Sequence, residues 1–230
     1  MRHARIGSLV VGLLVVIAAA SPAGASLFKT YDVLYGPENV PDAGTTVSLP
    51  QFDEATFGTL IGITLTLDAE ASAGVITWDN ESTQVTDVDL GIGGEVTAAA
   101  PSALTLIATP LQLGSGLGIL ADEAVETPDP DFAGLDSFSV TGGTGTDSDT
   151  DTLTNPADFG PYKGTGTFDV LISSIVKTMV LTSGGAGQTD ATAGLTSGKV
   201  TVTYEYVPEP ATLVLLGLGS LGLVIRRRRK

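Results

Sequence analysis

Hydrophobic and polar side chains alternate along most of the chain, in short runs rich in Val, Ile, Leu and Thr that Gly, Pro, Asp and Ser separate. The alternation is clearest in residues 61–67 and 200–206, where every second side chain is apolar. A period of two indicates a β-strand with one buried face. Shorter runs of the same kind predict further strands at residues 31–34, 46–49, 75–78, 85–92, 104–108, 137–140, 167–172 and 177–182.

The segments between these runs carry turn and loop signals. Residues 142–154 hold mainly Gly, Thr, Ser and Asp, so we expect a long exposed loop there, because such side chains bury little apolar surface. Residues 184–198 predict either a wide hairpin loop or a strand with little side chain to pack. Alternating Gly114, Gly116 and Gly118 predict a turn. Many short strands without a helical period between the chain ends predict an all-β fold, an antiparallel β-sandwich of the jelly-roll or Ig-like type.

The N-terminal end has the pattern of an export signal. Arg2 and Arg5 precede an apolar run over residues 6–20, and Ala23-Gly24-Ala25 supplies the small residues that signal peptidase cleaves after. Residues 1–25 are therefore predicted to be a cleaved signal helix, with Ser26 as the new N-terminus.

The C-terminal end predicts a membrane-spanning helix. A glycine-containing apolar run covers residues 211–225, and the basic residues that follow it are Arg226, Arg227, Arg228, Arg229 and Lys230. Basic clusters of this kind stay cytoplasmic, which places the rest of the chain beyond the membrane. Fifteen residues at about 1.5 Å each reach about 22 Å, less than the hydrocarbon core of about 30 Å. We therefore expect a transient single-pass anchor.

Val207-Pro208-Glu209-Pro210, followed by the apolar run and the basic cluster, resembles the PEP-CTERM sorting signal of Gram-negative bacteria that make exopolysaccharide. The resemblance implies that an exosortase, a multi-pass membrane enzyme, removes the tail of this signal, residues 207–230, and releases the protein or transfers it to the cell surface. Two prolines keep the backbone around Glu209 extended, which suits an enzyme substrate. The alternative is a plain membrane anchor in which the prolines only end the preceding strand.

Composition and charge restrict the function of the part between the two ends, residues 26–206, which we expect to be one exported domain. It holds 4 lysines against 25 acidic residues, a net charge of −21, which disfavours nucleic acid as a partner and suits divalent cations or a polysaccharide gel. The chain has no Cys, and its only His, His3, lies in the signal peptide. Ser-His-Asp or Cys-His catalysis and the usual zinc site are thereby excluded from the mature chain.

A second resemblance covers much of the exported part. Residues 47–53 (VSLPQFD), residues 57–67 (FGTLIGITLTL), Asn80-Glu81-Ser82 and residues 200–204 (VTVTY) are similar to the family called choice-of-anchor E. That family carries alternative surface anchors on a shared β-rich domain. The resemblance extends the prediction of a surface location and names no ligand.

One acidic pattern is a candidate Ca²⁺ site. Asp147, Asp149, Asp151 and Asp158 have the spacing of positions one, three, five and twelve of a calcium loop. Thr152 stands where that loop needs Gly, so a solvated acidic loop is the alternative. No other cofactor is expected.

Two further sets of residues have a functional and a structural interpretation. Trp78 with Asp79, Asn80 and Glu81 would suit a sugar platform, or Trp78 is a core residue beside a polar turn. Asp53 with Glu54, or Asp129 with Asp131, could serve as a glycosidase pair, but nothing in the sequence fixes their separation. We therefore expect a non-catalytic surface or matrix protein, associated with exopolysaccharide or biofilm. The alternative is a carbohydrate-binding or calcium-dependent adhesion module.

Overall fold

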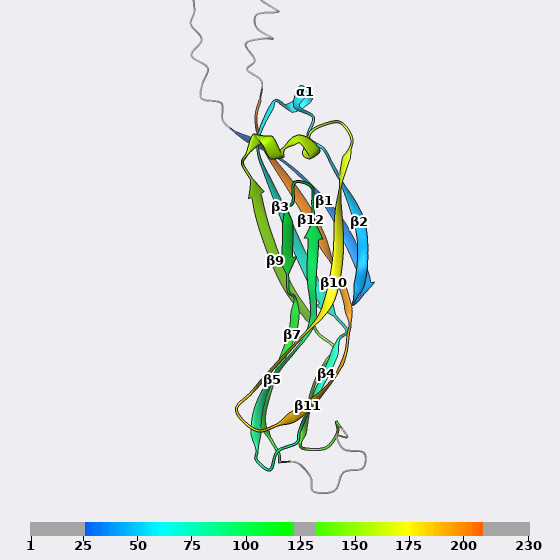
Figure 1. The fold of residues 1–230 in the computed structure, drawn as a ribbon, viewed down its shortest axis with the longest axis vertical. Coiled ribbons are helices and arrows are strands. Elements are labelled where there is room, and N and C mark those ends of the chain that lie inside the picture. The colour runs from blue at the N-terminus through cyan, green and yellow to red at the C-terminus, as the bar shows by residue number, and fades with distance from the viewer. Residues whose placement is uncertain (1–25, 122–131, 209–230) are drawn as a thin grey trace, which may run out of the picture. The chain divides into compact units, whose positions relative to one another are not determined.

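Antiparallel strands build the part of the chain that the computed structural model describes, residues 26–121 and 132–208 (Figure 1). Sheet I has the order β1 (Leu27–Asn39), β12 (Leu195–Val207), β3 (Thr59–Ser72) and β9 (Thr144–Leu153). Sheet II has the order β2 (Asp42–Pro50), β10 (Thr167–Thr182), β5 (Thr86–Ala99) and β6 (Thr105–Ala108), and β7 (Leu111–Ile119) also pairs with β5. Sheet III has the order β11 (Gly187–Thr192), β4 (Val75–Asn80) and β8 (Ser137–Thr141). The short helices are α1 (Glu54–Phe57), η1 (Pro156–Asp158) and η2 (Gly160–Tyr162).

The all-β sandwich predicted from the sequence is confirmed. The consecutive strands β1 and β2 lie in different sheets. Strand β1 pairs with β12 in sheet I, and β2 pairs with β10 in sheet II. This alternation follows the jelly-roll alternative, whereas an Ig-like domain would group its strands as ABED and CFG. The predicted signal helix and C-terminal helix lie outside the described residues.

Sheet I packs on one half of sheet II around a first core. The alternation in β3 places Ile63, Leu65 and Leu67 in this core, and β12 contributes Val200 and Val202, all of them fully buried. The two strongest sequence patterns are therefore confirmed as strands with one buried face.

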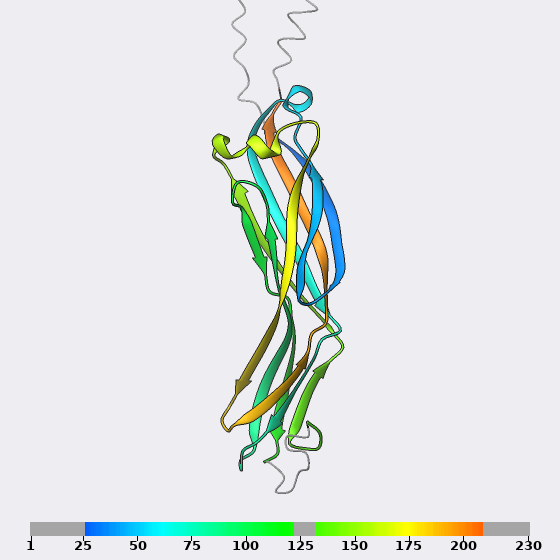
Figure 2. The same cartoon turned by 45° about the vertical axis from the view of Figure 1, so that its right-hand side comes forward.

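Sheet III packs on the other half of sheet II around a second core. Its members are Ile76, Trp78, Val88, Leu90, Ile92, Ile119 and Val140. Strand β10, coloured yellow to brown in Figure 2, passes from one sandwich into the other. Sheets I and III are instead connected through short breaks in the chain. Strand β3 of sheet I continues into β4 of sheet III, and β11 of sheet III continues into β12 of sheet I. Gly194 lies at one break, where a Cβ would overlap the carbonyl oxygen of Ser72.

The predicted loop over residues 142–154 is wrong, because β9 occupies most of it. Strand β9 pairs with β3 from Ile63↔Leu153 to Ser72↔Thr144. Thr or Ser alternates with Gly or Asp along most of this strand, so the sequence has a period of two but no alternation of apolar and polar side chains. Thr favours strands, and the position at the edge of sheet I leaves Asp147 and Asp151 exposed and Asp149 half-buried.

The predicted turn at Gly114, Gly116 and Gly118 is also wrong, because all three lie in β7. A Cβ on Gly114 would meet Val140, and one on Gly116 would meet Phe138, both on β8. The glycines therefore allow close packing of the two strands. In residues 184–198 the strand alternative holds, since β11 and the start of β12 lie there.

Candidate functional site

Strand β12 leads directly into the sequence that resembles a sorting signal. Its last residue, Val207, pairs with Thr59 of β3, and Pro208 follows at once. Proline has no N–H to offer a strand partner, which is a local reason for the strand to end there. Glu209, Pro210 and the basic residues Arg226 to Lys230 lie outside the described residues.

The start of the described chain, where the sequence predicts the exported N-terminus, lies beside this junction. Leu27 pairs with Tyr206, so the first strand begins where the last one ends. Ser26 is the first described residue, and Ala23 and Ala25 of the predicted cleavage site lie outside the described residues. Within residues 26–121 and 132–208, no helix has the length and apolarity needed to cross a membrane.

An aromatic cluster holds the end of β12. The ring centroid of Phe52 lies 5.2 Å from that of Tyr204 and 5.2 Å from that of Tyr206, and Phe57 lies 6.0 Å from Tyr206. The Tyr204 hydroxyl donates to the Pro50 carbonyl oxygen at 2.8 Å. Burial, and then the nearby Tyr162 and Tyr31, raise the pKa of Tyr204 far above its usual value. The strand that precedes the sorting signal is therefore anchored in the first core.

Asp53 and Glu54, considered above as a catalytic pair, have structural partners. Asp53 caps α1 by accepting from Ala55 N at 3.0 Å and from the Thr56 hydroxyl. Glu54 accepts from Leu60 N at 3.1 Å and lies 2.9 Å from Lys163 Nζ. Burial raises the pKa of Glu54, but the hydrogen bonds from Lys163 and Leu60 and the charge of Lys163 outweigh it and hold the pKa below its usual value. Asp129 and Asp131 lie outside the described residues.

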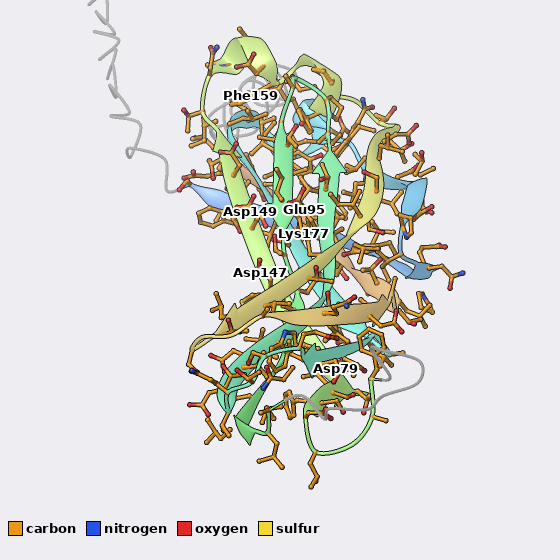
Figure 3. All side chains as sticks on the ribbon, turned by 60° about the horizontal axis from the view of Figure 1, so that its bottom comes forward. Asp79, Glu95, Asp147, Asp149, Phe159 and Lys177 are labelled. Atoms are coloured by element: carbon orange, nitrogen blue, oxygen red, sulfur yellow. The ribbon has the colours of Figure 1, made fainter. Side chains whose placement is uncertain are left out.

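The predicted calcium residues do not form a loop. Asp147, Asp149 and Asp151 stand at alternate positions of β9, and Figure 3 shows the first two along that strand. Asp149 Oδ2 accepts from Ile107 N at 2.8 Å, and Asp147 Oδ2 accepts from Thr109 N at 2.6 Å. Ile107 lies in β6, an edge strand of sheet II, and Thr109 directly follows it, so the carboxylates join the edges of the two sheets.

The other two acids are engaged separately. Asp151 Oδ1 accepts from the adjacent Thr152 N at 2.7 Å, and Asp158 lies in η1. Among the residues that the structure describes, no group of three or more His, Cys, Asp or Glu side chains is placed to hold a metal ion.

A groove of about 850 Å³ crosses sheet I on the face turned away from the first core. Strand pairing forms one row across it, Leu34↔Lys199↔Asp68↔Ser148, from β1 to β9. Lys199 Nζ lies 3.5 Å from Asp68 Oδ2. Sequence reasoning missed this groove, because its residues come from four strands far apart in the chain and become neighbours only through the register.

Hydroxyl groups continue this face beyond the groove. Three cross-strand threonine pairs have oxygen atoms 3.0 Å apart, namely Thr30 with Thr203, Thr64 with Thr152 and Thr66 with Thr150. This face of sheet I therefore combines hydrogen-bonding groups with an apolar surface, as a site for a polyhydroxylated molecule would. The hydrogen-bonding groups are carboxylates, hydroxyls and the ammonium group of Lys199, and the apolar surface is the exposed Leu34.

Trp78 is not a surface platform. Its side chain is 1% exposed within the second core, so the core interpretation is confirmed. Asn80 Nδ2 donates to the carbonyl oxygens of Gln84 and Leu120 at 2.8 and 2.5 Å. Asp79, labelled in Figure 3, is also buried and accepts from Phe132 N at 3.1 Å.

Comparison with known proteins identifies the C-terminal segment. A family model described as the PEP-CTERM protein-sorting motif matches residues 207–229, so the motif begins at the last residue of β12. Fold and motif together define an all-β body that carries a C-terminal sorting motif. Such a motif implies an exported surface protein of Gram-negative bacteria that exosortase processes.

The other comparisons add little. No curated protein matches the sequence. Empty heads of turnip yellow mosaic virus give 10% identity over 92% of this chain and 94% of the viral chain, with a TM-score of 0.19. Turnip yellow mosaic virus gives 11% identity over 91% and 92%, with a TM-score of 0.18. Infectious bursal disease virus, Gx strain, gives 12% identity over 88% and 50%, with a TM-score of 0.18. Scores this low support no argument about fold or function.

Proposed function

We propose that this chain is a non-catalytic surface or matrix protein whose β body, residues 26–206, is delivered outside the cell by signal peptidase and exosortase. The body is tethered transiently through residues 211–225, and processing then leaves it at the cell surface or in the surrounding matrix. The sorting-motif match at residues 207–229 supports the route.

The observation that carries the proposal is the position of the strands relative to the two processing sites. Strand β1 begins at Leu27, directly after the expected signal peptide, and β12 ends at Val207, directly before Pro208. Apart from Val207, the first residue of the sorting motif, every residue of the described strands lies between the expected signal peptide and that motif. Removal of the signal peptide and the sorting motif would therefore take no whole strand from either sandwich.

The proposed absence of catalysis is supported by the chemistry of the mature chain. It has no Cys or His, and Asp53 and Glu54 serve as helix cap and ion-pair partner. The buried Phe52 and the cap at Asp53 also give the residues of the choice-of-anchor E resemblance a structural role. We propose that the chain belongs to that family.

We further propose that the groove of sheet I associates with exopolysaccharide. Its carboxylates accept from sugar hydroxyls, Lys199 donates, and Leu34 offers an apolar surface to a sugar ring. A calcium-dependent adhesive role has less support, because Asp147 and Asp149 already bind the edge of β6. The test is cosedimentation of the processed protein with the exopolysaccharide of the producing cells. Lys199→Ala should weaken it, whereas Lys163→Ala, which removes an ion-paired lysine outside the groove, should not. Equal binding by both variants would reject the groove.

The sorting proposal has its own test. Replacing Pro208 and Glu209 with Ala should leave a full-length protein in the membrane fraction, whereas replacing the exposed Val85 with Ala should leave processing unchanged. Normal release of the Pro208/Glu209 variant would overturn the route. The two tests are independent, because sugar binding depends on the groove and release depends on the sorting motif. Failure of one test rejects only the proposal that it addresses.

A further inference from the structure

Strand β10 has one free edge. Its first part, Thr167 to Ser174, pairs with β2, and β5 joins its other edge from Leu171 on, but Ile175 to Thr182 pairs only with β5 among the described residues. We call Ile175–Thr182 the free edge of β10. Backbone N–H and C=O groups along such an edge are a template for another strand.

Apolar side chains are uncovered on both faces of this edge. Val176 and Val180 face the second core beside Gly94 and Leu90, yet each is 38% exposed. Ile175 and Leu181 lie on the opposite face and are 52% and 59% exposed. A partner packed against one face of the sheet would leave the side chains of the other face exposed. A strand added at the edge reaches both faces, so the exposed side chains indicate a neighbouring strand as the partner.

Another edge of sheet II shows how this chain protects a strand. The carboxylate of Asp149 accepts the N–H group of Ile107 on β6, and that of Asp147 accepts the N–H group of Thr109, directly after β6. No acidic residue occurs from Val170 to Thr189, so the free edge of β10 has no such device of its own. Proteins usually cover or charge long apolar edges, and an edge left bare is a pairing surface.

We propose that the free edge of β10 pairs with the same edge of a second copy of this chain. The two β10 strands would pair antiparallel about a two-fold axis through Thr178. Residues equally far before and after Thr178 then face each other, and both members of such a pair stand on the same face of the sheet. Val176 then faces Val180 of the second copy, and Ile175 faces Leu181. The two copies form one continuous sheet that covers the apolar side chains on both faces.

Charge makes this edge the surface where a second copy meets the least repulsion. The exported body has a net charge of −21, so two bodies repel each other over most of their surfaces. The edge itself carries no acid, and its one charged residue, Lys177, is neutralised by Glu95 at 2.8 Å; Figure 3 shows the two side by side. Lys177 faces Met179 of the second copy in the proposed register, so no lysines meet.

Cysteine cross-linking tests the register, because the chain has no Cys of its own. Facing residues of antiparallel strands have Cα atoms about 4.5–5.5 Å apart, which suits a disulfide. The exported protein with Thr178→Cys should form disulfide-linked dimers under mild oxidation. Thr189→Cys, on the exposed edge strand β11, should form at least tenfold fewer. Similar cross-linking of both variants, or none of Thr178→Cys, would overturn the register.

Sedimentation equilibrium of the exported protein tests the dimer itself. The unmodified chain should dimerise, more strongly in 0.5 M than in 0.05 M NaCl because salt screens the acidic bodies. Val180→Lys should stay monomeric, and Val85→Lys, the same change at another exposed site, should dimerise normally. A chain that is monomeric at all concentrations, or a Val180→Lys variant that still dimerises, would contradict the proposal.

Discussion

The carboxylate of Asp149 on β9 accepts a hydrogen bond from the backbone N–H of Ile107 on β6, with Oδ2 and N 2.8 Å apart. The two residues belong to different sheets, and Asp147 repeats the contact at Thr109. Acidic side chains thus close one open side of the sandwich. A charged acceptor also prevents another strand from pairing with β6.

We expect the double variant Asp147→Ala/Asp149→Ala to lose stability. Hydrogen bonds to charged groups contribute about 1.5–3 kcal/mol each, and partial exposure reduces this, so a combined loss of about 2 kcal/mol is expected. Asp151→Ala is the control, because its carboxylate accepts from the adjacent Thr152 N on the same strand. Urea unfolding measures both. Equal stability of the two variants would show that the contacts with β6 contribute nothing.

The same variants test the calcium hypothesis for Asp147, Asp149, Asp151 and Asp158. Because two of these carboxylates bind β6, we expect any change in melting temperature with 5 mM Ca²⁺ to be the same in the double variant and in the unmodified protein. A stabilisation that the double variant loses would identify this strand as a Ca²⁺ site.

The ion pair of Glu54 with Lys163 predicts a pH dependence. The folded-state pKa of Glu54 is lowered, so its contribution is present above the unfolded pKa of about 4.3 and is lost as the pH falls through the folded value. Glu54→Gln should therefore be less stable at pH 7, by up to about 1 kcal/mol for this partly exposed pair, and the difference should vanish once the pH falls below the folded-state pKa. Lys163→Met should show the same profile. A difference that persists unchanged at low pH would contradict the assignment.

Tyr162 predicts the opposite behaviour at high pH. Burial raises its pKa to about 12, so its contribution is complete below the unfolded pKa of about 10 and falls as the pH rises towards 12. Its hydroxyl also donates to the Pro101 carbonyl oxygen at 2.8 Å. Tyr162→Phe should lose about 1 kcal/mol at pH 8 and should lose less further stability than the unmodified protein between pH 10 and 12. Parallel pH curves from urea unfolding would refute this.

Strands with an apolar face could be predicted from the sequence, and strands without one could not. Ile63 and Leu65 alternate with threonines, so β3 was recognisable from its period alone. Strand β9 alternates Thr with Asp, and its place in the sheet depends on pairing with β3 and on the N–H groups of β6. In β7, Gly114 and Gly116 resemble turn residues until the side chains of β8 that fill their space are known.

The sorting motif could be predicted because its residues are contiguous, whereas the groove could not. Asp68, Ser148 and Lys199 are neighbours only through the register of β3, β9 and β12. The division into two cores was equally hidden, because β5 and β10 run through both sandwiches and the breaks after β3 and β11 are only two residues long.

Intact-mass analysis of the protein recovered from the producing cells tests the central claim most directly. The chain should begin at Ser26 and lack the apolar run and basic cluster of residues 211–230, with any attached group visible as added mass. A mass that retains residues 211–230 would make the C-terminus a plain membrane anchor and would contradict processing by exosortase.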